Sequence, residues 1–88
     1  MRVSFNTDGW EDYVYWQAAD PKLAARINEI LKDIKRHPFE GIGKPEPLRG
    51  DQKGYWSRRI TQEHRIVYTV TGKGDDQTVI VTQCRFHY

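Results

Sequence analysis

Hydrophobic and polar residues follow two different periods in the first part of the chain. Residues 2–6 alternate, with Val3 and Phe5 on one side, which predicts a short β-strand. Residues 7–37 instead carry apolar side chains every three or four positions, which predicts two short amphipathic helices joined by a tight turn. We expect the apolar sides of these helices to pack against a β-sheet.

The ends of the two helices follow from local signals. The first helix should begin at Thr7 or Asp8 and run to about Ala18, with Asp8 and Glu11 at the spacing of a capping box. The second should begin at residues 20–21, an aspartate followed by proline, and end at a histidine–proline pair, residues 37–38. The predicted apolar faces are Trp10, Tyr13, Val14 and Gln17 in the first helix and Leu23, Ile27, Ile30, Leu31 and Ile34 in the second.

Residues 38–50 are predicted to form a loop. They contain three of the four prolines and three of the seven glycines, so neither a helix nor a central strand can run through them. Phe39, Ile42 and Leu48 provide apolar anchors, which favours an ordered loop over a linker. Residues 47–49 leave room for a brief edge strand.

Alternation returns after a polar turn at residues 51–54. Residues 56–60 and 65–71 predict a β-hairpin, in which successive side chains point to opposite faces. One face should carry Trp56, Arg58 and Ile60, and the other Ser57, Arg59 and Thr61. Guanidinium groups bind phosphate through two N–H groups at once, but strand arginines also serve simply to keep a sheet soluble, and the pattern fits both roles.

A last strand is predicted at residues 77–86, and because it is apolar on both faces it should be central in the sheet. Its two faces should carry Ile80, Thr82 and Cys84 on one side and Val79, Val81 and Gln83 on the other. The order of elements predicts an α+β fold, with two N-terminal helices packed on one face of a small, mainly antiparallel sheet. At 88 residues the chain should form a single domain, residues 1–88, whose other face is free for function.

Charge and cysteine content narrow the class of protein. The net charge of +2 is too small to indicate nucleic-acid binding by itself. Residues 1–44 contain seven basic and seven acidic side chains and residues 45–88 contain seven and five, so the excess lies with the hairpin. The single cysteine, Cys84, excludes an internal disulfide, and no apolar run is long enough for a signal peptide or a membrane span. We therefore expect a cytoplasmic protein with no membrane partner.

Several side chains could converge on the free face. Glu46 would come from the loop, Arg65 from the hairpin, and His87 and Tyr88 from the chain end. Arg59 would join them only if the hairpin turn has the right parity, which the sequence leaves open.

A carboxylate, a histidine and an arginine suit cleavage of RNA through its own 2′-hydroxyl group. Glu46 would act as the base and His87 as the acid, Arg65 would stabilise the phosphate charge, and Tyr88 would orient or stack on the substrate. We expect no metal or other cofactor, because the histidines and Cys84 lack zinc-ligand spacing and no glycine-rich phosphate loop is present. Taken singly, Glu46 also fits a solvated loop residue and His87 a frayed chain end.

Longer motifs resemble a known family. Residues 10–17 (WEDYVYWQ), 38–48 (PFEGIGKPEPL) and 56–68 (WSRRITQEHRIVY), with the terminal CRFHY, are similar to YoeB-type toxins of the RelE superfamily. These are ribosome-dependent mRNA endoribonucleases of bacterial toxin–antitoxin modules. The motifs follow in the same order at the same spacing, so the resemblance covers nearly the whole chain.

The resemblance implies site residues and partners. Glu46, Arg65, His87 and Tyr88 match the family's catalytic positions. The basic positions expected to contact mRNA or ribosomal RNA are Lys44, Arg49, Arg58 and Arg59. The implied partners are the ribosome with its mRNA and an antitoxin of the YefM or Phd kind. The toxin would bind operator DNA only through this antitoxin. Whether the toxin forms a homodimer is left undecided. The alternative hypothesis is a non-cleaving protein that occupies the ribosome or represses its own operon with the antitoxin.

Overall fold

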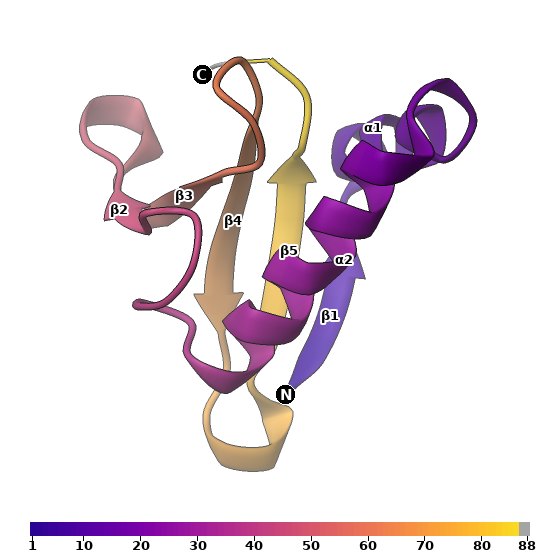
Figure 1. Ribbon diagram of the computed structural model, residues 1–88. Helices are drawn as coiled ribbons and strands as arrows, with labels where there is room; N and C mark the ends of the chain where they lie inside the picture. The colour runs from indigo at the N-terminus through magenta and orange to yellow at the C-terminus, as the bar shows by residue number, and fades with distance from the viewer. Residues whose placement is uncertain (87–88) are drawn as a thin grey trace.

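Five strands form one mixed sheet in the order β1-β5-β4-β3-β2, and two helices cover one of its faces (Figure 1). The computed structural model describes residues 1–86. The elements are β1 (Arg2–Phe5), α1 (Thr7–Ala19), α2 (Pro21–Arg36), β2 (Glu46–Pro47), β3 (Tyr55–Arg59), β4 (Arg65–Thr71) and β5 (Thr78–Gln83), with short 3-10 helices at Gly50–Gln52 and Gly74–Asp76. The predicted α+β fold with two N-terminal helices is confirmed.

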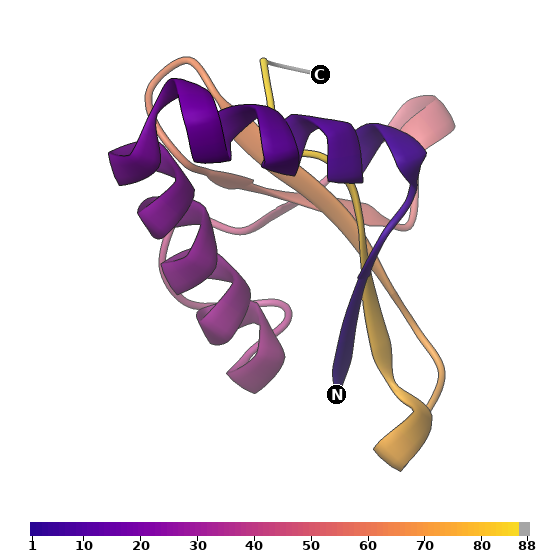
Figure 2. The same ribbon diagram turned by 90° about the vertical axis from the view of Figure 1, so that its right-hand side faces the viewer.

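The first and last strands of the described chain lie side by side. β1 runs parallel to β5, whereas the pairs β5–β4, β4–β3 and β3–β2 are antiparallel. β5 therefore has a neighbour on each side, as its apolar sequence predicts. Figure 2, turned by 90°, shows α1 and α2 meeting at a sharp angle, with the chain passing from β1 directly into α1.

The hydrophobic core lies between α2 and the sheet. The apolar face predicted for α2 is confirmed, because all five of its residues are buried. The Asp20 side chain accepts a hydrogen bond from the N–H of Leu23 at 3.2 Å, which caps the helix where the sequence predicts its start. The strands contribute Ile66, Tyr68, Val79 and Val81 to the same core, and Ile60, just after β3, joins them. No helix within residues 1–86 is long and apolar enough to cross a membrane.

The predictions for α1 are correct in its start at residue 7 and wrong in its cap and its buried face. The cap is Asn6, whose Oδ1 accepts the N–H of Gly9 at 2.8 Å, and not the predicted Asp8–Glu11 box. The buried residues are Gly9 and Trp16, while Trp10 is 52% exposed. A Cβ atom on Gly9 would lie 2.3 Å from the Val81 carbonyl oxygen, so only glycine lets α1 approach β5 this closely.

Two predicted strand boundaries also differ from the structure. The edge strand covers Glu46–Pro47 instead of residues 47–49, and β5 ends at Gln83 instead of continuing to residue 86. Beyond β5, Cys84 is bonded to α1: its N–H donates to Asp12 Oδ2 at 3.1 Å and its carbonyl accepts from Trp16 Nε1 at 2.8 Å. The strand alternation predicts that Cys84 shares a face with Ile80. In the structure, Cys84 instead lies beyond the strand and is buried in the core.

One charged side chain is fully buried in the core. Arg58 is 0% exposed and lies on the same face of the hairpin as Trp56 and Ile60, as the alternation predicts. Its five N–H groups match five acceptors. These are Asp33 Oδ2 at 2.6 Å, the Tyr68 hydroxyl at 3.1 Å, and the backbone carbonyls of His37, Glu40 (2.8 Å) and Ile42 (3.2 Å).

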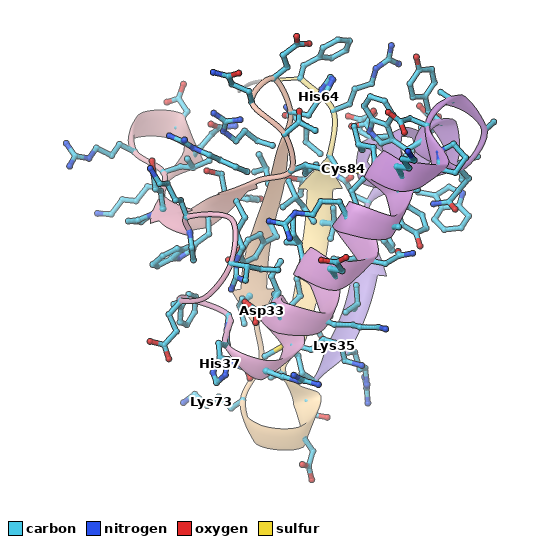
Figure 3. The ribbon with its side chains drawn as sticks, viewed as in Figure 1. Asp33, Lys35, His37, His64, Lys73 and Cys84 are labelled. Carbon is cyan, nitrogen blue, oxygen red and sulfur yellow. The ribbon has the colours of Figure 1, made fainter. Side chains whose placement is uncertain are left out.

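Three acceptors of Arg58 are carbonyls of the loop that follows α2, so the buried charge organises that loop. Figure 3 labels Asp33 in α2 and His37 where this loop begins. Asp33 Oδ2 also accepts the N–H of Ile42 at 3.0 Å. The Tyr68 hydroxyl, whose pKa burial raises, stays protonated and donates to the Pro38 carbonyl at 2.6 Å. Gly41 has φ +120° and approaches Asp33 so closely that a Cβ would lie 1.9 Å from its carboxylate.

Replacing Arg58 by methionine should destabilise the protein by about 3–5 kcal/mol, because Asp33 and three loop carbonyls would lose their donor in a buried place. Urea unfolding at neutral pH measures this change. The matched control is Arg59→Met on the neighbouring exposed residue, which should change stability by less than about 0.5 kcal/mol. Equal urea midpoints for the two variants would contradict the role assigned to Arg58.

The same ion pair predicts a pH dependence of stability. The hydrogen bond from Arg58 is the main reason that the pKa of Asp33 lies below its ordinary value of 3.8; partial burial opposes this shift and the bond from Ile42 N–H supports it. A carboxyl group with a lowered pKa stabilises the fold above its unfolded-state pKa, and this contribution is lost as the pH falls through the folded-state value. Asp33→Asn should therefore be less stable than the wild type at pH 7, with a gap that closes in urea titrations below pH 3.8. A gap that stays constant with pH would argue against this linkage.

The buried thiol offers a probe of global opening. Burial, followed by the negative charge of Asp12, raises the pKa of Cys84 to about 12, and its side chain is 0% exposed. Because the thiolate is the reactive form, Cys84 should react with a disulfide reagent at pH 8 only as fast as the protein unfolds, and at once in urea. Rapid labelling of the native protein would show that α1 opens locally over Cys84.

Candidate active site

A small hollow on the sheet gathers the candidate side chains. It has a volume of about 150 Å³ and is lined by Lys44, Glu46, Ser57, Arg59 and Arg65, from the loop, β2, β3 and β4. Three of these residues carry a positive charge and one a negative charge. The hollow therefore favours an anionic group such as a phosphate.

Strand register explains why these residues meet. Glu46 is paired with Ser57, and Arg59 is paired with Arg65, in neighbouring antiparallel ladders. Paired residues share a face, as do residues two apart on one strand, so Glu46, Ser57, Arg59 and Arg65 all point away from the helices. This answers the question of parity that the sequence leaves open: Arg59 lies on the same face as Arg65.

Arg65 is held in place before any substrate binds. Its Nη1 donates to the carbonyl oxygens of Thr61, Gln62 and His64 at 3.0, 3.2 and 3.2 Å. These three carbonyls belong to the turn between β3 and β4, and the Arg65 side chain is half-buried. An anchored guanidinium loses little freedom on binding an anion, which is what a preorganised phosphate site requires.

The loop delivers Lys44 and Glu46 in a constrained conformation. The Gly43 carbonyl accepts the N–H of Arg59 at 2.6 Å, and Lys44 then has φ 51°, in the left-handed region. For a residue with a Cβ this conformation costs about 1–2 kcal/mol, and it persists only where surrounding contacts enforce it. Here those contacts are the bonds that hold the loop around Arg58.

Ser57 is a member of the site that the sequence reasoning did not select. It is 3% exposed, is paired with Glu46 in the β2–β3 ladder, and lines the hollow. The only available signal was the alternation that placed Ser57 on the same face as Arg59. A serine offers a hydroxyl group that both donates and accepts hydrogen bonds.

The other predicted basic residues have different positions. Arg49 is exposed and lines a neighbouring hollow of about 490 Å³ with Glu46, Pro47 and Leu48. The prediction that Arg58 contacts RNA is wrong, because its side chain is fully buried and its donors are used by Asp33, Tyr68 and the loop. Acceptors on α2, the loop after it and β4 allow this strand arginine to be buried.

The predicted acid and its neighbour, His87 and Tyr88, lie outside the described residues. The structure describes the chain up to Phe86, whose carbonyl accepts the N–H of Arg65 at 3.1 Å. The last described residue is thus bonded to the residue that carries the anchored guanidinium. Within residues 1–86, no group of three or more His, Cys, Asp or Glu side chains is arranged to hold a metal ion.

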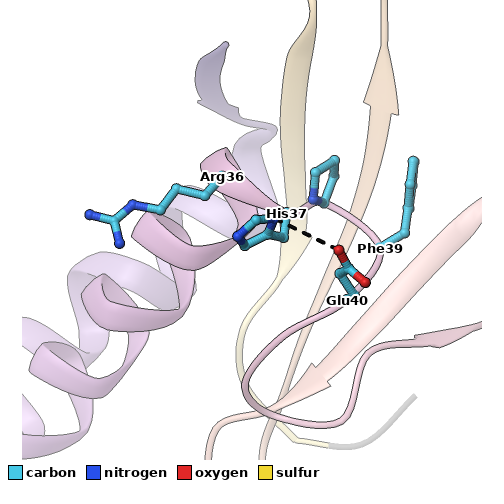
Figure 4. A pocket seen from close by; sticks show the side chains of 5 residues that line it. Arg36, His37, Phe39 and Glu40 are labelled. Carbon is cyan, nitrogen blue, oxygen red and sulfur yellow. Dashed lines mark ion pairs between the residues drawn. The ribbon is translucent and has the colours of Figure 1, made fainter.

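A separate pocket lies where α2 ends (Figure 4). It has a volume of about 260 Å³, and its lining residues are Arg36, His37, Pro38, Phe39 and Glu40. His37 Nδ1 and Glu40 Oε1 are 3.8 Å apart, and both side chains are mostly exposed. Of the predicted catalytic residues that the structure describes, neither Glu46 nor Arg65 lines this pocket.

Comparison with known proteins agrees with this architecture. Residues 5–88 match the family model described as the YoeB-like toxin of bacterial type II toxin–antitoxin systems. The toxin YoeB of Streptomyces coelicolor is 58% identical over 88 residues, which cover 100% of both chains. The YoeB/ParE toxin from Agrobacterium tumefaciens has a similar structure, with a TM-score of 0.95, 52% identity and complete coverage of both chains.

A third relative has been solved in two assemblies. The YoeB dimer from Staphylococcus aureus has a TM-score of 0.87 at 45% identity, and the toxin in the heterotetrameric YoeB–YefM complex has a TM-score of 0.86 at 46% identity. Both matches cover 100% of the present chain and 98% of the other. The chain belongs to the family of YoeB-like toxins of bacterial type II toxin–antitoxin systems.

Proposed function

We propose that this toxin is an endoribonuclease that cleaves mRNA in the A site of the ribosome. The observation that carries the proposal is the hollow in which one carboxylate, Glu46, lies among Lys44, Arg59 and Arg65. A base beside a fixed cluster of cations is the arrangement needed to attack a phosphodiester from its own 2′-hydroxyl group.

The reaction proceeds in one displacement. Glu46 takes the proton from the 2′-hydroxyl, the 2′-oxygen forms a bond to phosphorus, and the bond from phosphorus to the 5′-oxygen breaks. His87 gives a proton to the departing 5′-oxygen. The products are a 2′,3′-cyclic phosphate on one fragment and a free 5′-hydroxyl on the other.

The cations stabilise the charge that develops on the phosphate oxygens. Arg65 and Arg59 lie side by side across the β3–β4 ladder, so two guanidinium groups can face one phosphate. Arg65 is already anchored to the turn, which lowers the reorganisation needed in the transition state. Tyr88 orients or stacks on the substrate. Because protons move between side chains and fixed cations balance the charge, the mechanism needs no metal ion.

The size of the hollow supports dependence on the ribosome. At about 150 Å³ it is smaller than the roughly 300–1,000 Å³ of pockets that enclose small ligands, so it accommodates a phosphate group but not a whole nucleotide. The RNA therefore has to be held in register by a larger surface. The exposed Lys44 and Arg49 would contact the backbone of the mRNA or of ribosomal RNA.

The antitoxin is the second proposed partner. The Staphylococcus aureus relative forms a complex with YefM, and we propose an antitoxin of the same kind for this chain. The toxin would contact operator DNA only through that antitoxin. The same relative also forms a dimer, which supports a homodimer of this toxin. In the cytoplasm, the antitoxin would hold the toxin inactive by covering or distorting the site.

Glu46→Gln, Arg65→Ala and His87→Ala should each lower cleavage by about 10²–10⁴-fold, since each removes a proton-transfer group or a charge-stabilising group. The measurement is primer extension on a defined mRNA in programmed ribosomes. To test whether a metal ion is needed, toxin treated with EDTA before the assay is compared with untreated toxin, and both should cleave equally. Lys32→Gln, on the exposed side of α2, is the control and should cleave like the wild type.

The outcomes separate the two hypotheses. If all three variants cleave like the wild type, the catalytic assignment is wrong. If the wild type binds ribosomes and leaves the mRNA intact at every concentration, the non-cleaving inhibitor is the better description.

A further inference from the structure

The described chain ends in a segment whose backbone is held at nearly every polar group. Residues 84–86 follow β5 but belong to no strand. The N–H and carbonyl of Cys84 are bonded to Asp12 and Trp16, and the carbonyl of Arg85 accepts from Gln83 Nε2 at 2.9 Å. The first two residues of the segment are thus held by side chains.

Both backbone polar groups of Phe86 form hydrogen bonds. Its N–H donates to His64 Nδ1 at 2.8 Å, and its carbonyl accepts the N–H of Arg65 at 3.1 Å. Phe86 has φ 65°, in the left-handed region that a side chain with a Cβ rarely adopts. Since Phe86 is 58% exposed, burial of its side chain does not explain this conformation.

The His64 ring is itself fixed in place. It stands edge-on against Trp16, with ring centroids 4.7 Å apart, and Trp16 is anchored to the Cys84 carbonyl. The backbone of His64 is bonded within the turn, where Thr61 Oγ1 accepts its N–H at 3.1 Å and its carbonyl accepts the N–H of Ile60 at 3.0 Å. In Figure 3, His64 lies at the β3–β4 turn.

We infer that His64 is a positioning residue for the cleavage reaction. Its Nδ1 fixes the Phe86 amide, and the next residue along the chain is His87, the proposed acid. The same turn also holds the Arg65 guanidinium through the His64 carbonyl, so one turn holds both the phosphate-binding group and the amide of the last described residue. This inference rests on the proposed function, since it assigns His64 a task in that reaction.

The bond assigns a tautomer to the neutral ring. An Nδ1 atom that accepts the Phe86 N–H carries no proton, so the proton of neutral His64 is on Nε2. His64 is therefore used as a hydrogen-bond acceptor, while its ring contacts with Trp16 and Phe86 are a separate, structural contribution.

Two substitutions separate these contributions. His64→Asn places its side-chain oxygen at the position of Nδ1 and removes the ring, whereas His64→Phe keeps a ring and removes the acceptor. His64→Phe should lower kcat by about 10–100-fold with little change in KM for programmed ribosomes, as expected when a catalytic group is misplaced without loss of binding. His64→Asn should restore kcat to within about threefold of the wild type. Equal losses in the two variants, or a wild-type kcat for His64→Phe, would overturn the inference.

NMR provides readouts that do not depend on cleavage. The Phe86 amide should exchange slowly with solvent in the wild type and in His64→Asn, and faster in His64→Phe. In the wild type alone, the ¹⁵N shifts of the neutral His64 ring should show a proton on Nε2 and an unprotonated Nδ1. Because free histidine also favours this tautomer, slow exchange of the Phe86 amide must accompany it, and neither readout needs a variant to fold. The opposite tautomer would refute the bond. If the wild type does not cleave mRNA, the proposed function fails, while these NMR results still establish or refute the hold on Phe86.

Discussion

The buried guanidinium of Arg58 is the interaction on which the rest of the structure depends. A charge in the core is tolerated only when every one of its donors is matched, and here five acceptors are supplied by α2, the loop after it and β4. The loop has few contacts of its own, since it is rich in proline and glycine and most of its side chains are exposed. Its shape therefore comes mainly from hydrogen bonds to α2 and the sheet. Arg58 makes three of them, and Asp33, Tyr68 and the Arg59 N–H make one each.

This dependence extends to the reacting groups. The loop fixed by Arg58 passes through Gly43, whose carbonyl is bonded to Arg59, and continues through the strained Lys44 to Glu46. On the other side of the hollow, the β3–β4 turn holds the Arg65 guanidinium and the Phe86 backbone. The proposed site is thus assembled from three segments that are distant in sequence, each held by hydrogen bonds that lie outside the hollow. A loop position is accurate enough for catalysis only with such support.

The sequence predicts best where the cause is local. The Asp20 cap and the apolar period of α2 follow from contacts within one helix, and both are correct. The buried face of α1 could not be predicted in this way, because it depends on how closely Gly9 lets the helix approach β5. Arg58 was assigned to RNA from the resemblance to known toxins, although the alternation had already grouped it with Trp56 and Ile60.

The candidate site shows the same division. The chemistry of Glu46 and Arg65 is visible in the residue types, but their proximity depends on strand register, and register depends on turn lengths that a pattern of alternation does not fix. The same reason left the side of Arg59 open and left Ser57 unselected. The role of His64 could not be predicted from the sequence, because its partner, the Phe86 amide, belongs to the backbone of a distant segment.

The pairing of β1 with β5 also constrains the order of folding during synthesis. β1 is translated first, but its strand partner β5 lies near the other end of the described chain. Contacts between such distant segments form late and slowly. A growing chain can make the two helices early, yet it cannot close the sheet or fix residues 84–86 until β5 has been made. A nascent toxin is therefore without its complete site while its own message is still being translated.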